Sequence, residues 1–152
     1  MSNRSNVDFT FLNVHKESVG RILGGNFDDE VVITYVDETC CIAFNEVSYG
    51  ELDGLEGLQK EGIPYDSYWQ AGDEYSAGGE YVRFTPEGEM VKKTIYVEEE
   101  TTIQIHELLK VLDDHAALKK VILDHQNFLT ILPFDNQEEF GKRYRTKQLI
   151  SP

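Results

Sequence analysis

The sequence has only two cysteines, Cys40 and Cys41, and they are adjacent. Neighbouring side chains on a strand point to opposite faces of a sheet, and a disulfide between them would be strained. The pair therefore cannot cross-link distant parts of the fold, which favours a compartment in which thiols stay reduced. The chain also lacks an apolar run of the roughly 20 residues that a membrane helix needs, and its first ten residues lack the apolar core of a signal peptide. We therefore expect a cytoplasmic protein with no membrane partner.

The motifs that identify common catalytic and cofactor sites are absent as well. The sequence contains no GxxxxGK[ST] or GxGxxG phosphate-binding loop and no GxSxG nucleophile motif. It also contains no HExxH, CxxC or EF-hand pattern. Of its four histidines, His115 and His125 lie ten residues apart, or roughly 15 Å along a helix, which is too far for one metal ion. We therefore expect no metal and no cofactor, and we favour a protein that is not an enzyme.

Basic side chains are scarce relative to acidic ones. The chain has 14 Lys and Arg against 28 Asp and Glu, a formal net charge of -14. Four of the basic residues lie within residues 141–152, which contain no acid, so residues 1–140 hold 14 - 4 = 10 basic and 28 acidic residues, a balance of -18. Such a charge repels nucleic acid and attracts basic surfaces. We expect a single acidic domain over residues 1–134 and a basic, weakly structured C-terminal tail over residues 135–152.

The distribution of β-branched and aromatic residues predicts two hairpins. Residues 31–36 and 40–47, VVITYV and CCIAFNEV, form the strongest pair of strand patterns. Residues 79–85 and 89–97 form a second pair, joined by a Pro-Glu-Gly turn in which proline takes a favoured turn position. We expect both hairpins to belong to one antiparallel sheet.

Helical spacing of leucine and isoleucine predicts three helices, over residues 51–61, 103–114 and 115–127. Residues 7–14 alternate as a half-buried strand does. Residues 128–132 fit either a last strand or the end of the third helix. Strands and helices are partly segregated along the chain, so we expect an α+β fold in which the sheet packs against two or three helices.

The stretch from residue 62 to residue 97 contains the only Trp, five of the eight Tyr, and acidic residues beside several of those tyrosines. We expect residues 62–97 to form a rigid, protruding contact surface that includes a Tyr/Trp-rich loop over residues 65–81, since Tyr and Trp are enriched among the residues that dominate protein interfaces. The alternative is that Tyr65, Trp69 and Tyr81 cover the sheet. The candidate contact residues are Asp66, Trp69, Asp73, Glu74, Tyr75, Glu80 and Tyr81, with Glu98, Glu99 and Glu100 as a second patch.

These observations favour a non-enzymatic binding protein whose acidic face engages a basic protein surface. In size, charge and lack of catalytic motifs the chain resembles the small acidic proteins of phages and mobile elements that inhibit restriction or CRISPR enzymes. This resemblance implies a DNA mimic, an anti-CRISPR type of inhibitor that occupies the groove of a nuclease or defence complex. Two alternatives stay open: a small-ligand or glycan-binding domain, or an enzyme, that uses the loop over residues 65–81, and an accessory domain whose acidity serves only solubility.

Overall fold

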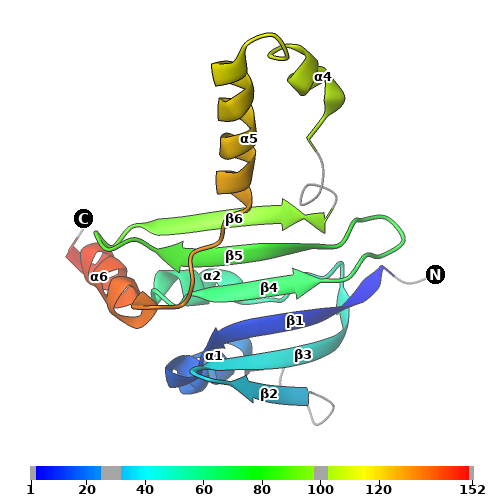
Figure 1. Ribbon diagram of the computed structural model, residues 1–152. Coiled ribbons are helices and arrows are strands. Elements are labelled where there is room, and N and C mark those ends of the chain that lie inside the picture. Colours follow the sequence, from blue (N-terminus) through cyan, green and yellow to red (C-terminus); the bar gives the residue numbers. More distant parts are fainter. Residues whose placement is uncertain (1–2, 25–31, 98–102, 151–152) are drawn as a thin grey trace.

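The computed structural model describes residues 3–24, 32–97 and 103–150, and it is an α+β fold built on one antiparallel sheet (Figure 1). The six strands lie in the order β2-β3-β1-β4-β5-β6. Their bounds are β1 Arg4–Leu12, β2 Val32–Val36, β3 Thr39–Ser48, β4 Tyr65–Trp69, β5 Gly78–Phe84 and β6 Met90–Tyr96. The helices are α1 Lys16–Leu23, α2 Leu55–Lys60, α4 Ile105–Leu109, α5 His115–Leu129 and α6 Gln137–Ile150, with a 3-10 turn η1 over Asn13–His15. The predicted fold class is confirmed.

Both predicted hairpins are present. Strands β2 and β3 pair antiparallel up to the Val36–Thr39 pair, and a two-residue turn joins them. Its first residue, Asp37, has a φ of 51°, a left-handed conformation that aspartate tolerates better than most residues. Strands β5 and β6 pair from Gly78–Tyr96 to Phe84–Met90. The sequence identifies these pairs because each is made by neighbouring segments joined by a short turn.

Helices α1 and α2 cover one face of the sheet, the far side in Figure 1. Alternate residues of β1, Val7, Phe9 and Phe11, are fully buried on this face. The Phe9 ring lies 5.7 Å from that of Phe11 and 5.2 Å from that of Tyr65, measured between ring centroids. An aromatic cluster on the central strands therefore forms the middle of the core.

The prediction of a protruding loop over residues 65–81 is wrong for its first part. Residues 65–69 form β4, which lies between β1 and β5 in the middle of the sheet. Tyr65 and Ser67 face the core, whereas Asp66 and Tyr68 face the opposite side. The alternation was hidden because an aspartate and a serine between aromatic residues resemble loop composition. Only residues 70–77 connect β4 with β5.

The predicted helices are found with different bounds. Helix α2 begins after Gly54, whose φ of 93° is incompatible with a right-handed helix, so it is shorter than residues 51–61. Helix α4 occupies only residues 105–109 of the predicted 103–114. Helix α5 begins after Asp114, whose side chain accepts a hydrogen bond from the Ala117 amide, and it continues to Leu129. The second alternative for the first residues of 128–132, the end of a helix, is thus the one observed.

The expectation of a weakly structured segment over residues 135–152 is wrong, because residues 137–150 form α6. Helix α6 packs against the end of β5, where the Tyr144 ring lies 5.0 Å from the Phe84 ring. Gly62 and Gly141 meet backbone to backbone, and a side chain at either position would collide with the other. Lys142 pairs with Glu138 and Arg143 with Glu139 along the helix, while Arg143 and Lys147 also donate to the carbonyl oxygens of Pro86 and Glu87 in the β5–β6 turn. Docking on the sheet, rather than helical amphipathicity alone, orders this segment.

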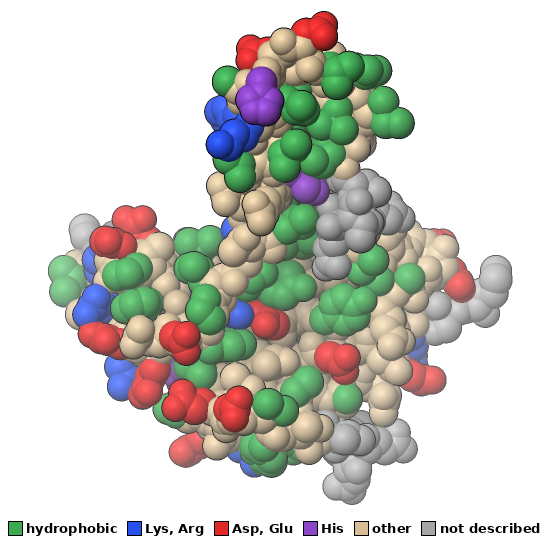
Figure 2. Space-filling model, in the orientation of Figure 1, with side chains coloured by type: hydrophobic (Ala, Val, Ile, Leu, Met, Phe, Trp, Pro, Cys, Tyr) green, Lys and Arg blue, Asp and Glu red, His purple; other side chains and the backbone are tan. Residues whose placement is uncertain are grey.

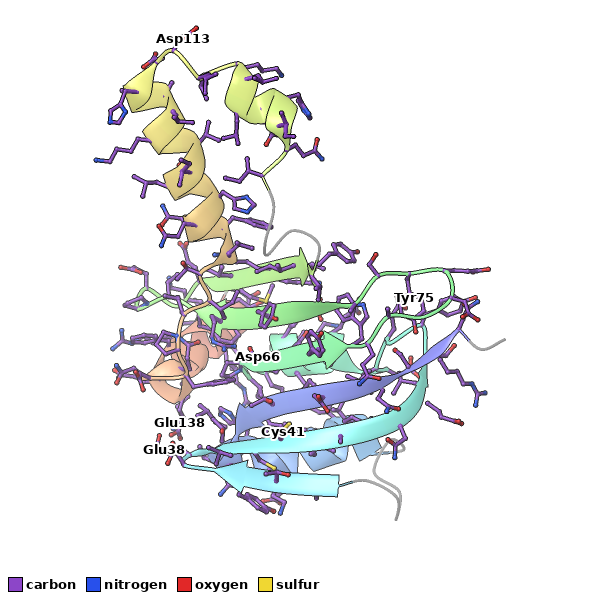
Figure 3. The ribbon with its side chains drawn as sticks, turned by 45° about the vertical axis from the view of Figure 1, so that its right-hand side comes forward. Glu38, Cys41, Asp66, Tyr75, Asp113 and Glu138 are labelled. Atoms are coloured by element: carbon purple, nitrogen blue, oxygen red, sulfur yellow. The ribbon has the colours of Figure 1, made fainter. Side chains whose placement is uncertain are left out.

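Helices α4 and α5 project away from the sheet beside β6 (Figure 1). We call residues 103–129 the arm. Its tip is marked by Asp113, which is labelled in Figure 3. The second predicted acidic patch, Glu98, Glu99 and Glu100, lies outside the described residues.

Candidate binding cleft

The sheet separates the residues that the sequence groups into one contact surface. Trp69, Tyr75 and Glu80 line a cleft on the face that carries α2. Asp66 and Tyr81 lie on the opposite face, because they alternate with those residues along β4 and β5. Asp66 and Tyr75 are labelled in Figure 3, which shows them at opposite ends of this part of the sheet. The predicted residues therefore contribute to two surfaces rather than one.

Asp73 and Glu74 are exposed in the connection between β4 and β5. Glu74 accepts a hydrogen bond of 3.2 Å from the side-chain amide of Asn3, which also donates to the hydroxyl of Tyr49 at 3.3 Å. This contact places Glu74 beside the cleft, since Tyr49 lines it.

The cleft lies between α2, the segment that precedes it, and strands β4 to β6, and its volume is about 450 Å³. This is within the usual range for ligand sites in proteins. Four aromatic and three acidic side chains line it, with a single lysine. They are Tyr49, Trp69, Tyr75 and Tyr96, then Glu51, Glu56 and Glu80, and Lys92. The cleft thus combines π faces with negative charge.

Two pairs of aromatic rings form its walls. The Trp69 and Tyr96 ring centroids are 6.1 Å apart with the rings nearly perpendicular, at 78°. The Tyr49 and Tyr75 ring centroids are also 6.1 Å apart, at 46°. The indole Nε1 of Trp69 donates a hydrogen bond of 2.9 Å to the carbonyl oxygen of Ser76. This bond fixes the indole and ties the β4–β5 connection to the cleft wall.

Two glycines make room for the indole. Gly50 has a φ of 67°, and a Cβ atom added there would lie 2.6 Å from the Cβ of Trp69. A Cβ atom added at Gly78, in the neighbouring strand, would lie 2.9 Å from the Cζ2 of Trp69. The Trp69 side chain is therefore held between two stretches of bare backbone.

We expect Gly50→Ala to displace Trp69 and to lower the free energy of unfolding by about 1–3 kcal/mol, because a non-glycine residue at positive φ is strained. Tryptophan emission and urea denaturation measure the two effects. Gly20→Ala is the matched control, since a Cβ added there in α1 meets nothing within 4 Å. We expect that variant to be unchanged or slightly more stable. Equal behaviour of the two variants would contradict the close fit at Gly50.

A short hydrogen-bonded chain forms the floor of the cleft. The side-chain amide of Gln59 donates to the Tyr65 hydroxyl at 2.9 Å, and that hydroxyl donates to a carboxylate oxygen of Glu80 at 2.8 Å. The other Glu80 oxygen lies 3.0 Å from the Nζ of Lys92. Burial raises the pKa of the Tyr65 hydroxyl, and the negative charge of Glu80 raises it further, so the group stays protonated and donates.

The exposed edge of the cleft carries negative charges that no basic side chain of the lining neutralises. Glu51 and Glu56 are exposed, and among the described residues neither forms an ion pair. Lys92 compensates Glu80, so the lining keeps a net charge of about -2. Neither cysteine nor histidine is among the described lining residues, and the described part of the chain holds no cluster of three or more metal-binding side chains. The aromatic faces and carboxylates of the lining are groups that attract cations.

Tyr49, Glu51, Glu56 and Tyr96 were not among the predicted site residues. They come from the segment before α2 and from the edge strand β6, and only the tertiary fold brings them to Trp69. The acids between the leucines of residues 51–61 were the available signal, since they mark the outer side of a helix that covers the sheet.

Asp66 has a structural partner on the open face. Its carboxylate lies 2.7 Å from the guanidinium of Arg83, whose side chain is only 5% exposed. Arg83 also donates to the carbonyl oxygens of Leu132, Tyr65 and Val82 at 2.7, 3.2 and 3.0 Å. Its guanidinium lies 3.9 Å from the Phe134 ring centroid. Asp66 therefore orients Arg83, which in turn binds the segment after α5 to the sheet.

Among the described helices, none has the length and apolar character that crossing a bilayer would require. Comparison of the chain with protein-family models, with curated proteins and with solved structures finds no match.

Proposed function

We propose that the protein is a non-enzymatic binding protein that engages a basic protein surface by receiving a lysine or arginine side chain in the cleft. The supporting observation is the lining itself, four aromatic side chains and three carboxylates around a single lysine. A cation held over Trp or Tyr faces is attracted by their quadrupoles, and the attraction grows when water is excluded. The carboxylates of Glu51 and Glu56 at the rim would steer a basic partner towards the cleft.

The distribution of charge favours the cleft over a uniform acidic face. Figure 2 shows the face opposite α1 and α2, on which acidic side chains occur in small scattered groups between hydrophobic and neutral ones. A DNA duplex presents one negative charge per ~1.7 Å of its axis, and a DNA mimic would need a similar density of carboxylates on its surface. DNA mimicry against a nuclease or defence complex is therefore a narrower proposal that rests on the net charge of -14 alone.

The test is a titration with a hexalysine peptide at low and moderate salt, followed by the fluorescence of Trp69 and by calorimetry. We expect saturable binding that weakens with salt. Glu51→Gln combined with Glu56→Gln should weaken it about tenfold, which corresponds to about 1.4 kcal/mol. The matched control is Asp8→Asn with Glu89→Gln, two exposed acids outside the cleft that change the net charge equally. Equal losses in both double variants would contradict a role for the cleft.

The same volume and lining would also hold a small ligand or a sugar ring, since aromatic faces stack on sugars and carboxylates accept their hydroxyl hydrogen bonds. Spermidine and an oligosaccharide panel, titrated in the same way, test this second candidate. Binding of a free ligand more tightly than the peptide would favour it. An accessory role for solubility alone would leave Trp69 emission unchanged by every probe.

A further inference from the structure

The arm is the one described part of the molecule built without a core. Every residue from 103 to 136 is exposed or half-buried, whereas the fully buried apolar residues all belong to other segments. Helix α5 has 15 residues and α4 only five. Isolated helices of this length are marginal in water, because most helical stability in proteins comes from a packed apolar face. The contacts within the arm therefore do not explain why its helices are stable.

Large apolar side chains are exposed along the arm. Six of them are exposed by 74, 62, 59, 45, 43 and 43%, in the order Ile105, Leu109, Leu112, Ile122, Leu123 and Phe128. Figure 2 shows hydrophobic surface along much of the arm. Six large apolar side chains exposed along the arm are more than the single scattered hydrophobic residues that a monomer normally exposes. The arm thus has a composition typical of a surface that is covered in the working molecule.

Side-chain hydrogen bonds cap both ends of α5, which distinguishes the arm from an unstructured loop. The Asp114 side chain caps its first turn by accepting from the Ala117 amide at 3.1 Å. At the other end, the Nζ of Lys93 in β6 donates to the carbonyl oxygens of Asn127 and Thr130 at 3.1 and 2.9 Å. A cation at a helix C-terminus also interacts favourably with the helix dipole. The sheet therefore holds α5 at its base and presents its length in a fixed direction.

The charge of the arm indicates what covers it. Residues 103–129 hold three basic and four acidic residues, a balance of -1, so the other residues carry -14 + 1 = -13. Two copies of this chain carry like charge over most of their surface, whereas the arm is close to neutral, so two arms can meet without the repulsion that two acidic faces would create. A basic partner would instead be drawn to the acidic remainder of the molecule.

We infer that the arm is a homodimerisation surface, on which α4 and α5 of one copy pack against the same helices of a second copy around a two-fold axis. Two helical hairpins that face each other form a four-helix bundle, a standard way to bury apolar faces of this kind. Twofold dimers are the commonest protein oligomers. An interface limited to the two short helices of each arm is small for a specific complex, so a dimer of modest affinity is expected.

Sedimentation velocity and light scattering over a wide range of protein concentration test this inference. The unmodified protein should show a concentration-dependent mass that rises to that of two chains, and added salt should favour the dimer by screening the acidic remainder. Leu109→Glu with Ile122→Glu should raise the dissociation constant at least 100-fold. The control is Leu149→Glu with Ile150→Glu, which places the same charges on α6 residues that are 80 and 76% exposed, and it should dissociate no more than a fewfold more easily.

The milder variant Leu123→Gln guards against unfolding of the arm, because it adds no charge and should still raise the dissociation constant. Circular dichroism of each variant, measured at dimer-forming concentration, reports whether α5 keeps its helicity. A monomeric mass at every concentration would overturn the inference. A dimer that resists the arm variants but dissociates with the α6 variants would overturn it equally, since it would place the contact elsewhere.

Discussion

Replacement of Arg83 by methionine should lower the free energy of unfolding by about 3–5 kcal/mol, the loss that follows removal of one member of a buried ion pair. Methionine keeps most of the volume of the side chain, so the effect reports lost polar contacts. The carboxylate of Asp66 and three backbone carbonyl oxygens, those of Leu132, Tyr65 and Val82, would lose their donor. Urea denaturation at neutral pH, followed by far-ultraviolet circular dichroism, measures the loss.

Two further variants show which property of Arg83 matters. Arg83→Lys keeps the charge but not the planar fork that serves several acceptors, so it should recover only part of the stability. Lys92→Met removes an ion pair with Glu80 in which the lysine is 45% exposed, and exposed pairs contribute about 1 kcal/mol or less. Comparable losses of unfolding free energy from Arg83→Met and Lys92→Met would show that the burial of Arg83 does not increase its contribution to stability.

Replacement of Gln137 by leucine should lower the free energy of unfolding by about 2–6 kcal/mol, because it leaves two buried backbone groups unpaired at about 1–3 kcal/mol each. The side-chain oxygen of Gln137 accepts from the Phe84 amide at 2.7 Å, and its nitrogen donates to the Phe84 carbonyl oxygen at 2.9 Å. The glutamine is 2% exposed. The Gln137 carboxamide thus takes the place of a strand residue beside Phe84, which lies beyond Val82, the partner of the first residue of β4. Loss of helicity at low urea, before the main transition, would show that α6 has detached from the sheet.

The variant Gln137→Glu separates hydrogen bonding from shape. Burial raises the pKa of the introduced carboxyl group above its ordinary value of about 4.3, and only the protonated form can donate to the Phe84 carbonyl oxygen. The folded state then keeps a proton that the unfolded state releases, so the stability is fully present below about pH 4.3 and is lost as the pH rises towards neutrality. A stability difference from the unmodified protein that does not change with pH would contradict this pairing.

The sequence predicted the elements whose partners are close along the chain. The hairpins of β2 with β3 and of β5 with β6 need only two short strands and a turn, and α5 shows its apolar spacing within fifteen residues. Strand β4 was missed because its alternation of Tyr, Asp, Ser, Tyr and Trp contains no aliphatic residue. Helix α6 was missed because its order depends on Phe84, Gly62 and the bare backbone of Gly141, which lie far apart in the sequence.

The candidate site was predicted in part for the same reason. Trp69, Tyr75 and Glu80 were singled out by composition and do line one cleft. Asp66 and Tyr81 were grouped with them because spacing along an expected loop says nothing about faces, whereas spacing along a strand does. Tyr49 and Tyr96 reach the cleft from segments whose positions depend on the strand order, which a single sequence does not reveal.

The place of β1 in the sheet sets the order in which the sheet can assemble. Strand β1 comes first in the sequence but lies third in the sheet, between β3 and β4. The pairing of β3 with β1 on one side and with β2 on the other uses only residues 4–48, so these three strands can pair before the rest of the chain has been synthesised. The seam with β4 must then join Phe11 to Tyr65 across a long loop. Closing such a loop costs entropy before any contact compensates it. We therefore expect this seam to close late in folding, and until it closes one edge of β1 lacks its backbone hydrogen-bond partner.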